Sequence, residues 1–123
     1  MVEAGLLGRK SGRGYYDYRE GAPALAPRTD AKLGEAVVDR VLAMLINEAV
    51  DAVMMRVASR EDIETSMTRG VNYPKGLLAW CDQIGPDVIL GRMDTLYDEY
   101  REDRYRASPL LRRISKEGGK VLA

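Results

Sequence analysis

The residue types able to do chemistry in this sequence are limited first by one that is missing. The 123 residues include no histidine and a single cysteine, Cys81. Histidine is the commonest general base near neutral pH. Its absence excludes Ser-His-Asp and Cys-His catalysis and most zinc sites within this chain. Cys81 lies beside Trp80 in an apolar stretch, and no histidine is present to make its thiolate. We therefore expect a buried, inert thiol, no catalytic residue and no metal site.

Carboxylates lie close together in the last third of the sequence, at Asp98, Glu99, Glu102 and Asp103. Pairs four residues apart share one face of a helix, where they could hold a metal ion or act as acid and base. Arginines are interleaved with these acids. The pattern therefore favours a solvated face of mixed charge over a site.

Basic side chains are also grouped there: Arg104, Arg106, Arg112, Arg113, Lys116 and Lys120. Such a group could hold the phosphates of a nucleic acid or of coenzyme A. Acidic residues dilute it, which favours an ordinary solvated surface. Over the whole chain, 19 Lys and Arg residues balance 19 Asp and Glu residues. No net charge therefore attracts nucleic acid or an anionic membrane, and we expect neither as a partner.

A glycine-rich basic loop near the start of the chain invites a phosphate-binding interpretation. Gly8, Gly12 and Gly14 alternate with basic residues, and backbone amides in such loops can cradle phosphates. However, the spacing is neither a Walker motif nor a dinucleotide fingerprint, and no apolar strand precedes it. A tight irregular turn, followed by tyrosines that pack on a body, is the favoured alternative. We expect no cofactor-binding residue in this chain.

Asn47 and Glu48 form a polar pair in the middle of an apolar stretch. A buried polar side chain needs hydrogen-bond partners. The favoured interpretation is structural, with the pair tying down a neighbouring loop such as the turn at 72–76. Contact with a substrate is the alternative.

One long helix over Asp30–Val57 must position these residues. Its apolar residues recur at three and four, the spacing that places side chains on one helix face. The apolar stripe is too wide to be covered by a single neighbour, so the helix is central in a bundle or also buried by another chain. We expect a homodimer, with candidate interface residues Val38, Leu42, Ile46 and Met54.

Shorter helices are predicted over 60–69, 77–84, 86 to about 104, and 109–117. Ser59 is expected to cap the first of them, and the second is expected to end at Gly85. Pro86 suits the first position of the third helix. The fold class is therefore all-α, a compact bundle of about five helices around one long central helix.

The remaining features concern organisation and location. No apolar run reaches the roughly 20 residues needed to span a bilayer, and a single cysteine suits a reducing cytoplasm. Pro23 and Pro27 mark a linker between an N-terminal tail and the helical body. Two hypotheses follow: an accessory or oligomerisation domain of an enzyme, or a non-enzymatic helical adaptor or dimerisation module. A tail that ends in a linker favours the first.

Three segments together resemble 3-hydroxyacyl-CoA dehydrogenases. Gly5–Tyr18, GLLGRKSGRGYYDY, resembles the Gly-Arg-Lys-Thr-Gly-x-Gly-Phe-Tyr-x-Tyr segment that closes their C-terminal domain. Leu45–Gly76 resembles the centre of the same domain, with Leu-Asn-Glu-Ala, Val-Ala-Ser, an acidic Asp-Ile and Gly-x-x-Tyr-Pro-x-Gly-Pro. Leu77–Gly85, LLAWCDQIG, continues the match. The fold that the resemblance implies is similar to the 6-phosphogluconate dehydrogenase C-terminal domain.

The order of these segments resembles bacterial members with two tandem C-terminal domains, such as 3-hydroxybutyryl-CoA and 3-hydroxyadipyl-CoA dehydrogenases. It implies that residues 1–20 close a preceding helical domain, that 21–31 form a linker and that 32–123 form the second helical domain. The parent enzyme would oxidise a (3S)-3-hydroxyacyl-CoA to the 3-oxoacyl-CoA with NAD, in fatty-acid or phenylacetate-type catabolism. An upstream Rossmann domain would bind the NAD and supply the histidine base, and the family's helical domain commonly forms the dimer contact.

Two departures from the family pattern bear on the site. Asp39 stands where the family's Pro-Gly-Phe-Ile-Val-Asn-Arg motif has its asparagine, and Gly76-Leu77 replaces Gly-Pro. A carboxylate only accepts hydrogen bonds, whereas an asparagine amide also donates them. The resemblance therefore carries over the fold and the pathway but no catalytic residue, and we expect the chain alone to be inactive.

Overall fold

The computed structural model describes residues 1–23, 26–27 and 29–122, and the chain divides into two compact units, Met1–Asp30 and Ala31–Ala123. The predicted linker at 21–31 includes Ala24, Leu25 and Arg28, which lie outside the described residues. That the first unit is the tail of a preceding domain stays a prediction.

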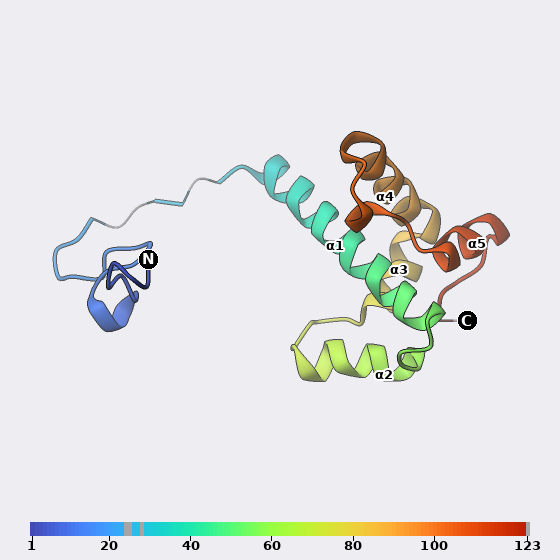
Figure 1. Ribbon diagram of the computed structural model, residues 1–123, viewed down its shortest axis with the longest axis horizontal. Helices are drawn as coiled ribbons and strands as arrows, with labels where there is room; N and C mark the ends of the chain where they lie inside the picture. Colours follow the sequence, from blue (N-terminus) through green and yellow to red (C-terminus); the bar gives the residue numbers. More distant parts are fainter. Residues whose placement is uncertain (24–25, 28, 123) are drawn as a thin grey trace. The chain divides into compact units, whose positions relative to one another are not determined.

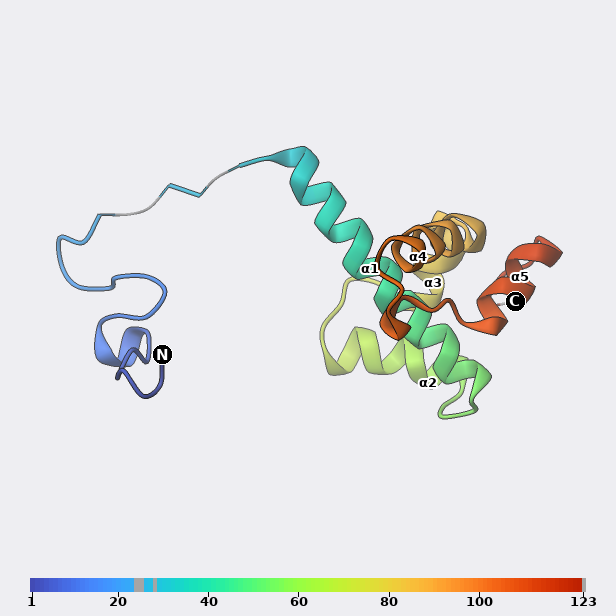
Figure 2. The same ribbon diagram turned by 45° about the horizontal axis from the view of Figure 1, so that its top comes forward.

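All the regular secondary structure in the described part of the second unit is helical, which confirms the predicted all-α class. Its helices are α1 (Ala31–Met54), α2 (Arg60–Thr65), α3 (Leu77–Ile84), α4 (Pro86–Tyr100) and α5 (Pro109–Glu117), with a π-helical turn η2 (Ser66–Gly70) and a 3₁₀ turn η3 (Asp103–Tyr105). The long helix α1 passes between α4 and α2 (Figures 1 and 2). It packs against α3, α4 and α5. α1 is therefore the central element of the bundle, as its apolar pattern predicted.

The core is built around the C-terminal half of α1. Its fully buried large side chains come from four of the helices and from the C-terminal segment: Ile46, Val50, Leu78, Ile89, Met93, Leu111 and Val121. Residues 31–39, in contrast, are all exposed in this unit. The wide apolar stripe is thus divided along the helix axis, with its second half in the core and its first half uncovered.

Ile46 corrects one of the interface predictions. Its side chain is 0% exposed and belongs to the core of a single chain. The periodicity alone gave it the same face as Val38 and Leu42, because residues four apart align along a helix. The neighbouring helices α3, α4 and α5 cover that face only over the second half of α1, so Ile46 cannot form a contact between chains.

The helix ends follow local chemistry. The Ser59 Oγ accepts a hydrogen bond from the Asp62 N–H at 3.1 Å, as predicted for the start of α2. The helix expected at 60–69 changes to π-helical geometry at Ser66. α4 ends at Tyr100, earlier than predicted, because Arg101 takes the left-handed conformation with φ 53°.

A carboxylate from α2 caps α3 across the intervening loop. The Glu64 side chain accepts hydrogen bonds from the Leu78 N–H at 2.7 Å and the Ala79 N–H at 3.2 Å. These are two of the otherwise unpaired donors at a helix start, where a negative charge is favourable. The capping carboxylate lies where a Cβ on Gly76 would stand. A side chain at this position would collide with it.

The C-terminal segment is fixed by three hydrogen bonds, to the side chains of Asp82 and Arg60. The Asp82 carboxylate accepts from the Val121 N–H at 2.6 Å and from the Leu122 N–H at 3.0 Å. The Arg60 Nε donates to the Val121 carbonyl at 2.6 Å. The Val121 side chain is 0% exposed. The end of the chain thus joins α2 and α3 to the core.

The N-terminal unit is a compact turn around the 3₁₀ helix η1 (Arg9–Ser11). Gly12 has a φ of 74°, and a Cβ on Gly14 would lie 2.8 Å from the Cα of Gly8. Both glycines are therefore required, the first by its backbone conformation and the second by close packing. The tyrosines expected to dock are instead exposed within this unit, with Tyr15 at 88%.

Candidate functional site: the cleft between α1 and α4

An open cleft of about 440 Å³ lies between the first half of α1 and α4. Its walls come from two helices: Ala36, Asp39 and Arg40 on α1, and Val88, Gly91, Arg92, Thr95 and Leu96 on α4. The lining combines aliphatic surface with three charged side chains. It contains the position at which the family motif has its asparagine.

Asp39 forms an ion pair with Arg92 across this cleft. The Asp39 Oδ2 lies 3.0 Å from the Arg92 Nη2, and both side chains are partly exposed. The other terminal nitrogen of Arg92, Nη1, is buried and has no hydrogen-bond partner among the described residues. Asp39 therefore joins α1 to α4 through an ion pair, which an uncharged asparagine could not form.

Arg40 is held by two tyrosines. Its guanidinium lies 4.8 Å from the ring centroid of Tyr100 and 5.1 Å from that of Tyr105. It donates hydrogen bonds to both tyrosine hydroxyls. These bonds, chiefly the one to Tyr105, raise the pKa of Arg40 above its usual value. The arrangement fixes η3 against α1 and keeps the guanidinium beside the cleft.

Asn47 lies deeper on α1 and is 2% exposed. Its Nδ2 donates to the Arg106 carbonyl at 3.1 Å, and its Oδ1 accepts from the Ser108 N–H at 2.7 Å. The loop that it holds is thus 106–108, which leads into α5, and not the turn at 72–76. Glu48 is exposed and shares none of these bonds. The two residues point to different faces because successive helical positions differ by about 100°.

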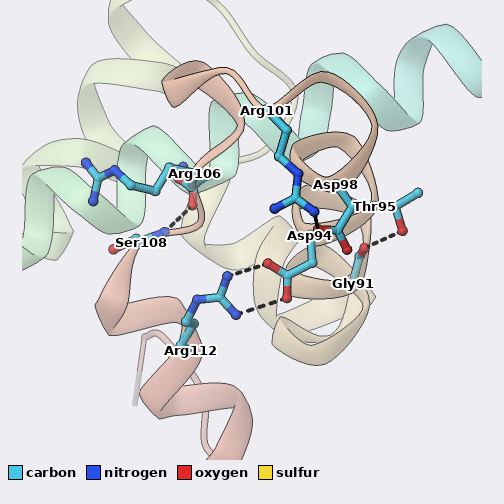
Figure 3. A network of polar contacts seen from close by, with 9 residues as sticks. Gly91, Asp94, Thr95, Asp98, Arg101, Arg106, Ser108 and Arg112 are labelled. Carbon is cyan, nitrogen blue, oxygen red and sulfur yellow. Dashed lines mark hydrogen bonds and ion pairs between the residues drawn. The ribbon is translucent and has the colours of Figure 1, made fainter.

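The acidic and basic residues near α4 form ion pairs, and the Asp94–Arg112 pair joins α4 to α5. Arg112 Nη1 donates to Asp94 Oδ2 at 3.0 Å and its Nη2 binds the other carboxylate oxygen (Figure 3). Asp98 pairs with Arg101 at 3.0 Å. No group of three or more potential metal ligands occurs among the described residues. These contacts fit the interpretation of a solvated surface of mixed charge.

The glycine-rich loop uses its own amides internally. The N–H groups of Gly8, Ser11, Gly12 and Gly14 all donate to backbone carbonyls of the same loop. A phosphate cradle needs such donors to be free. Asp17 and Arg19 form an adjacent ion pair, and the Arg19 guanidinium lowers the pKa of the Asp17 carboxyl. The loop thus fits the irregular-turn interpretation.

A second groove, wholly apolar, runs along the exposed half of α1. Its lining is Val37, Val38, Val41, Leu42, Leu45, Tyr73 and Trp80. Val38 is 60% exposed and Leu42 is half-buried. Met54 is also half-buried, but it lies at the other end of α1, with its sulfur 4.0 Å from the Ser108 Oγ. Of the candidate interface residues, Val38 and Leu42 therefore share one surface.

A family model described as 3-hydroxyacyl-CoA dehydrogenase, C-terminal domain, matches residues 37–120. The chain belongs to this family. As a 3-hydroxyacyl-CoA dehydrogenase C-terminal domain, it is 52% identical over 73 residues to the 3-hydroxyadipyl-CoA dehydrogenase of Escherichia coli K12, covering 59% of this chain and 15% of that protein. It is 46% identical over 78 residues to a 3-hydroxybutyryl-CoA dehydrogenase of Clostridioides difficile, covering 63% and 28%.

Solved structures agree with this family's fold. The (S)-3-hydroxybutyryl-CoA dehydrogenase of Ralstonia eutropha superposes with a TM-score of 0.64 at 40% identity, over 67% of this chain and 29% of that one. A 3-hydroxybutyryl-CoA dehydrogenase of E. coli K12 superposes with a TM-score of 0.70 at 25% identity, over 94% and 43%. The present C-terminal domain thus spans less than half of each of these proteins.

Sequence reasoning missed most of the cleft of this C-terminal domain. Arg92 and Gly91 were not singled out, because a lone arginine and a lone glycine in an amphipathic helix carry no spacing signal. The available signal was Asp39, a carboxylate where the family motif has an asparagine. No helix in the described part of the chain is long and apolar enough to cross a membrane.

Proposed function

We propose that this chain works as the C-terminal helical domain of an NAD-dependent enzyme that oxidises (3S)-3-hydroxyacyl-CoA to 3-oxoacyl-CoA. The match over residues 37–120 carries this proposal, and the names of the relatives point to fatty-acid or phenylacetate-type catabolism. Residues 1–20 would be the closing tail of a preceding helical domain. An upstream Rossmann domain would complete the parent enzyme, located in the cytoplasm.

The chain alone is expected to be inactive. It has no histidine to remove the hydroxyl proton, and Asp39 is engaged with Arg92. We do not expect the loop at 8–14 to bind NAD, because the amides of Gly8, Ser11, Gly12 and Gly14 already donate to nearby backbone carbonyls. The upstream part of the parent would therefore hold the cofactor, and this domain would support it without touching the reacting atoms.

The supporting role that we propose is self-association through the apolar groove on α1. Val37, Val38 and Val41 are each at least half exposed and lie beside Trp80 and Tyr73. Fully burying one large aliphatic side chain contributes roughly 1.5–3 kcal/mol, so a few of them can offset the cost of association. A homodimer with two-fold symmetry would cover the same groove on both subunits.

A chimera tests the enzymatic part of the proposal. The segment of the E. coli 3-hydroxyadipyl-CoA dehydrogenase that matches this chain would be replaced by the matching 73 residues. We expect the chimera to reduce NAD with its hydroxyacyl-CoA substrate, and the same enzyme without the segment to lose assembly and activity. The isolated chain should show neither NAD binding by calorimetry nor turnover. A folded, assembled but inactive chimera would favour the adaptor alternative.

The groove is tested with the isolated chain and two variants. Val38→Glu places a charge in the groove and should give a smaller species in light scattering. Val57→Glu is the matched control, because Val57 is 76% exposed and lies outside the groove. Both variants should keep their helical circular dichroism. A monomeric mass for the unmodified chain at tens of micromolar would overturn the homodimer.

A further inference from the structure

The charges of the residues that line the cleft between α1 and α4 do not cancel. Its lining contains two guanidinium groups, of Arg40 and Arg92, and one carboxylate, of Asp39. Arg92 forms the ion pair with Asp39. Arg40 interacts with tyrosines only, and no carboxylate lies within ion-pair distance of it in the described part of the chain. The cleft therefore carries an excess of one positive charge.

The rest of the lining is suited to an aliphatic group. Ala36, Val88 and Leu96 present apolar surface, and the hydroxyl of Thr95 bonds to the Gly91 carbonyl of its own helix at 2.9 Å. A Cβ on Gly91 would meet nothing within 4 Å. Glycine inside a helix costs roughly 0.5–1 kcal/mol relative to alanine, and here it leaves the cleft open.

We propose that this cleft binds a small molecule with a carboxylate and a short aliphatic body. The carboxylate lies beside Arg40 and Arg92, where it supplies the missing negative charge, and the aliphatic body lies along the apolar wall of α4. Charge-assisted bonds to guanidinium groups are among the stronger hydrogen bonds in proteins. The volume of about 440 Å³ lies within the range of small-molecule sites. This inference does not depend on the proposed enzymatic function.

Titration of the labelled 123-residue chain with hexanoate, followed by amide NMR, tests the proposal. We expect saturating shifts for residues 36–40 and 88–96 at millimolar concentration. Hexan-1-ol, with the same aliphatic body and no charge, should bind at least about tenfold more weakly, because a charge-assisted bond is lost. Hexylamine should be weaker still. Equal binding of hexanoate and hexan-1-ol would overturn the carboxylate site, and so would the absence of saturable shifts.

Filling the cleft supplies an independent test. Gly91→Leu should abolish the hexanoate shifts without loss of helicity, because the new side chain occupies open space. Gly70→Leu is the matched control, since Gly70 also has nothing within 4 Å of a built Cβ and does not line the cleft. Undiminished binding to a folded Gly91→Leu variant would refute the location. If that variant does not fold, the comparison of hexanoate with hexan-1-ol still decides the proposal.

Discussion

Replacing Asn47 by alanine should destabilise the helical unit more than any surface change on α1. The side chain is 2% exposed and forms two hydrogen bonds. It donates one to the Arg106 carbonyl and accepts one from the Ser108 N–H. Alanine would leave the buried Ser108 amide without its acceptor and the Arg106 carbonyl without its donor. An unsatisfied buried group costs about 1–3 kcal/mol. We therefore expect the free energy of unfolding to fall by about 2–4 kcal/mol, a large share of the roughly 5–15 kcal/mol that is typical of a single domain.

Urea unfolding followed by far-ultraviolet circular dichroism measures this loss. Glu48→Ala is the control, because Glu48 is the next residue of the same helix but is exposed. It should change the free energy of unfolding by less than about 0.5 kcal/mol. A cost for Asn47→Ala below about 1 kcal/mol, or no larger than that of the control, would refute the assignment of Asn47 as the tie between α1 and the loop before α5.

Gly76→Ala should cost about 2–4 kcal/mol in urea unfolding, because its Cβ displaces the Glu64 carboxylate that caps α3; if Glu64→Ala and Gly76→Ala add independently, this coupling is wrong. Burial raises the pKa of the Cys81 thiol to about 12, whereas an unfolded thiol ionises near about 8.5. The contribution of Cys81 to stability should therefore be constant below that value and fall as the pH rises toward about 12, and Cys81→Ala should flatten the fall; an unchanged slope would contradict the burial. Gly14→Val should speed amide exchange across residues 8–18, since its Cβ would lie 2.8 Å from the Gly8 Cα; exchange that is already unprotected in the unmodified chain would show that the turn does not persist.

Local rules were sufficient for most of the helices. Proline, glycine and capping residues set helix ends through interactions that span only a few positions. The starts of α2 and α4 and both ends of α3 could therefore be predicted from the sequence. The end of α4 did not, because it depends on the left-handed conformation of Arg101, a residue with no intrinsic preference for it. The π-helical turn after α2 likewise has no periodic signal.

The site was predictable only as a set of unusual residues. Asn47 was recognised as a buried polar group in need of partners, but its partners are about 60 positions away and belong to a loop that the pattern could not locate. Ile46 shows the same limit for burial. Periodicity assigned Ile46 to the apolar face of α1. Only the packing of α3, α4 and α5 shows that this part of the face is buried in the core of a single chain.

The exposed first half of α1 has a thermodynamic consequence. The side chains of residues 31–39 are all exposed and none lies in the core, and isolated helical segments of this length are only marginally stable in water. Amide-exchange protection should therefore rise gradually along α1 toward Ile46. A partner that covers this half must order it as it binds. Its association should then show a large negative heat-capacity change, together with an unfavourable entropy of ordering that tempers the affinity of the contact.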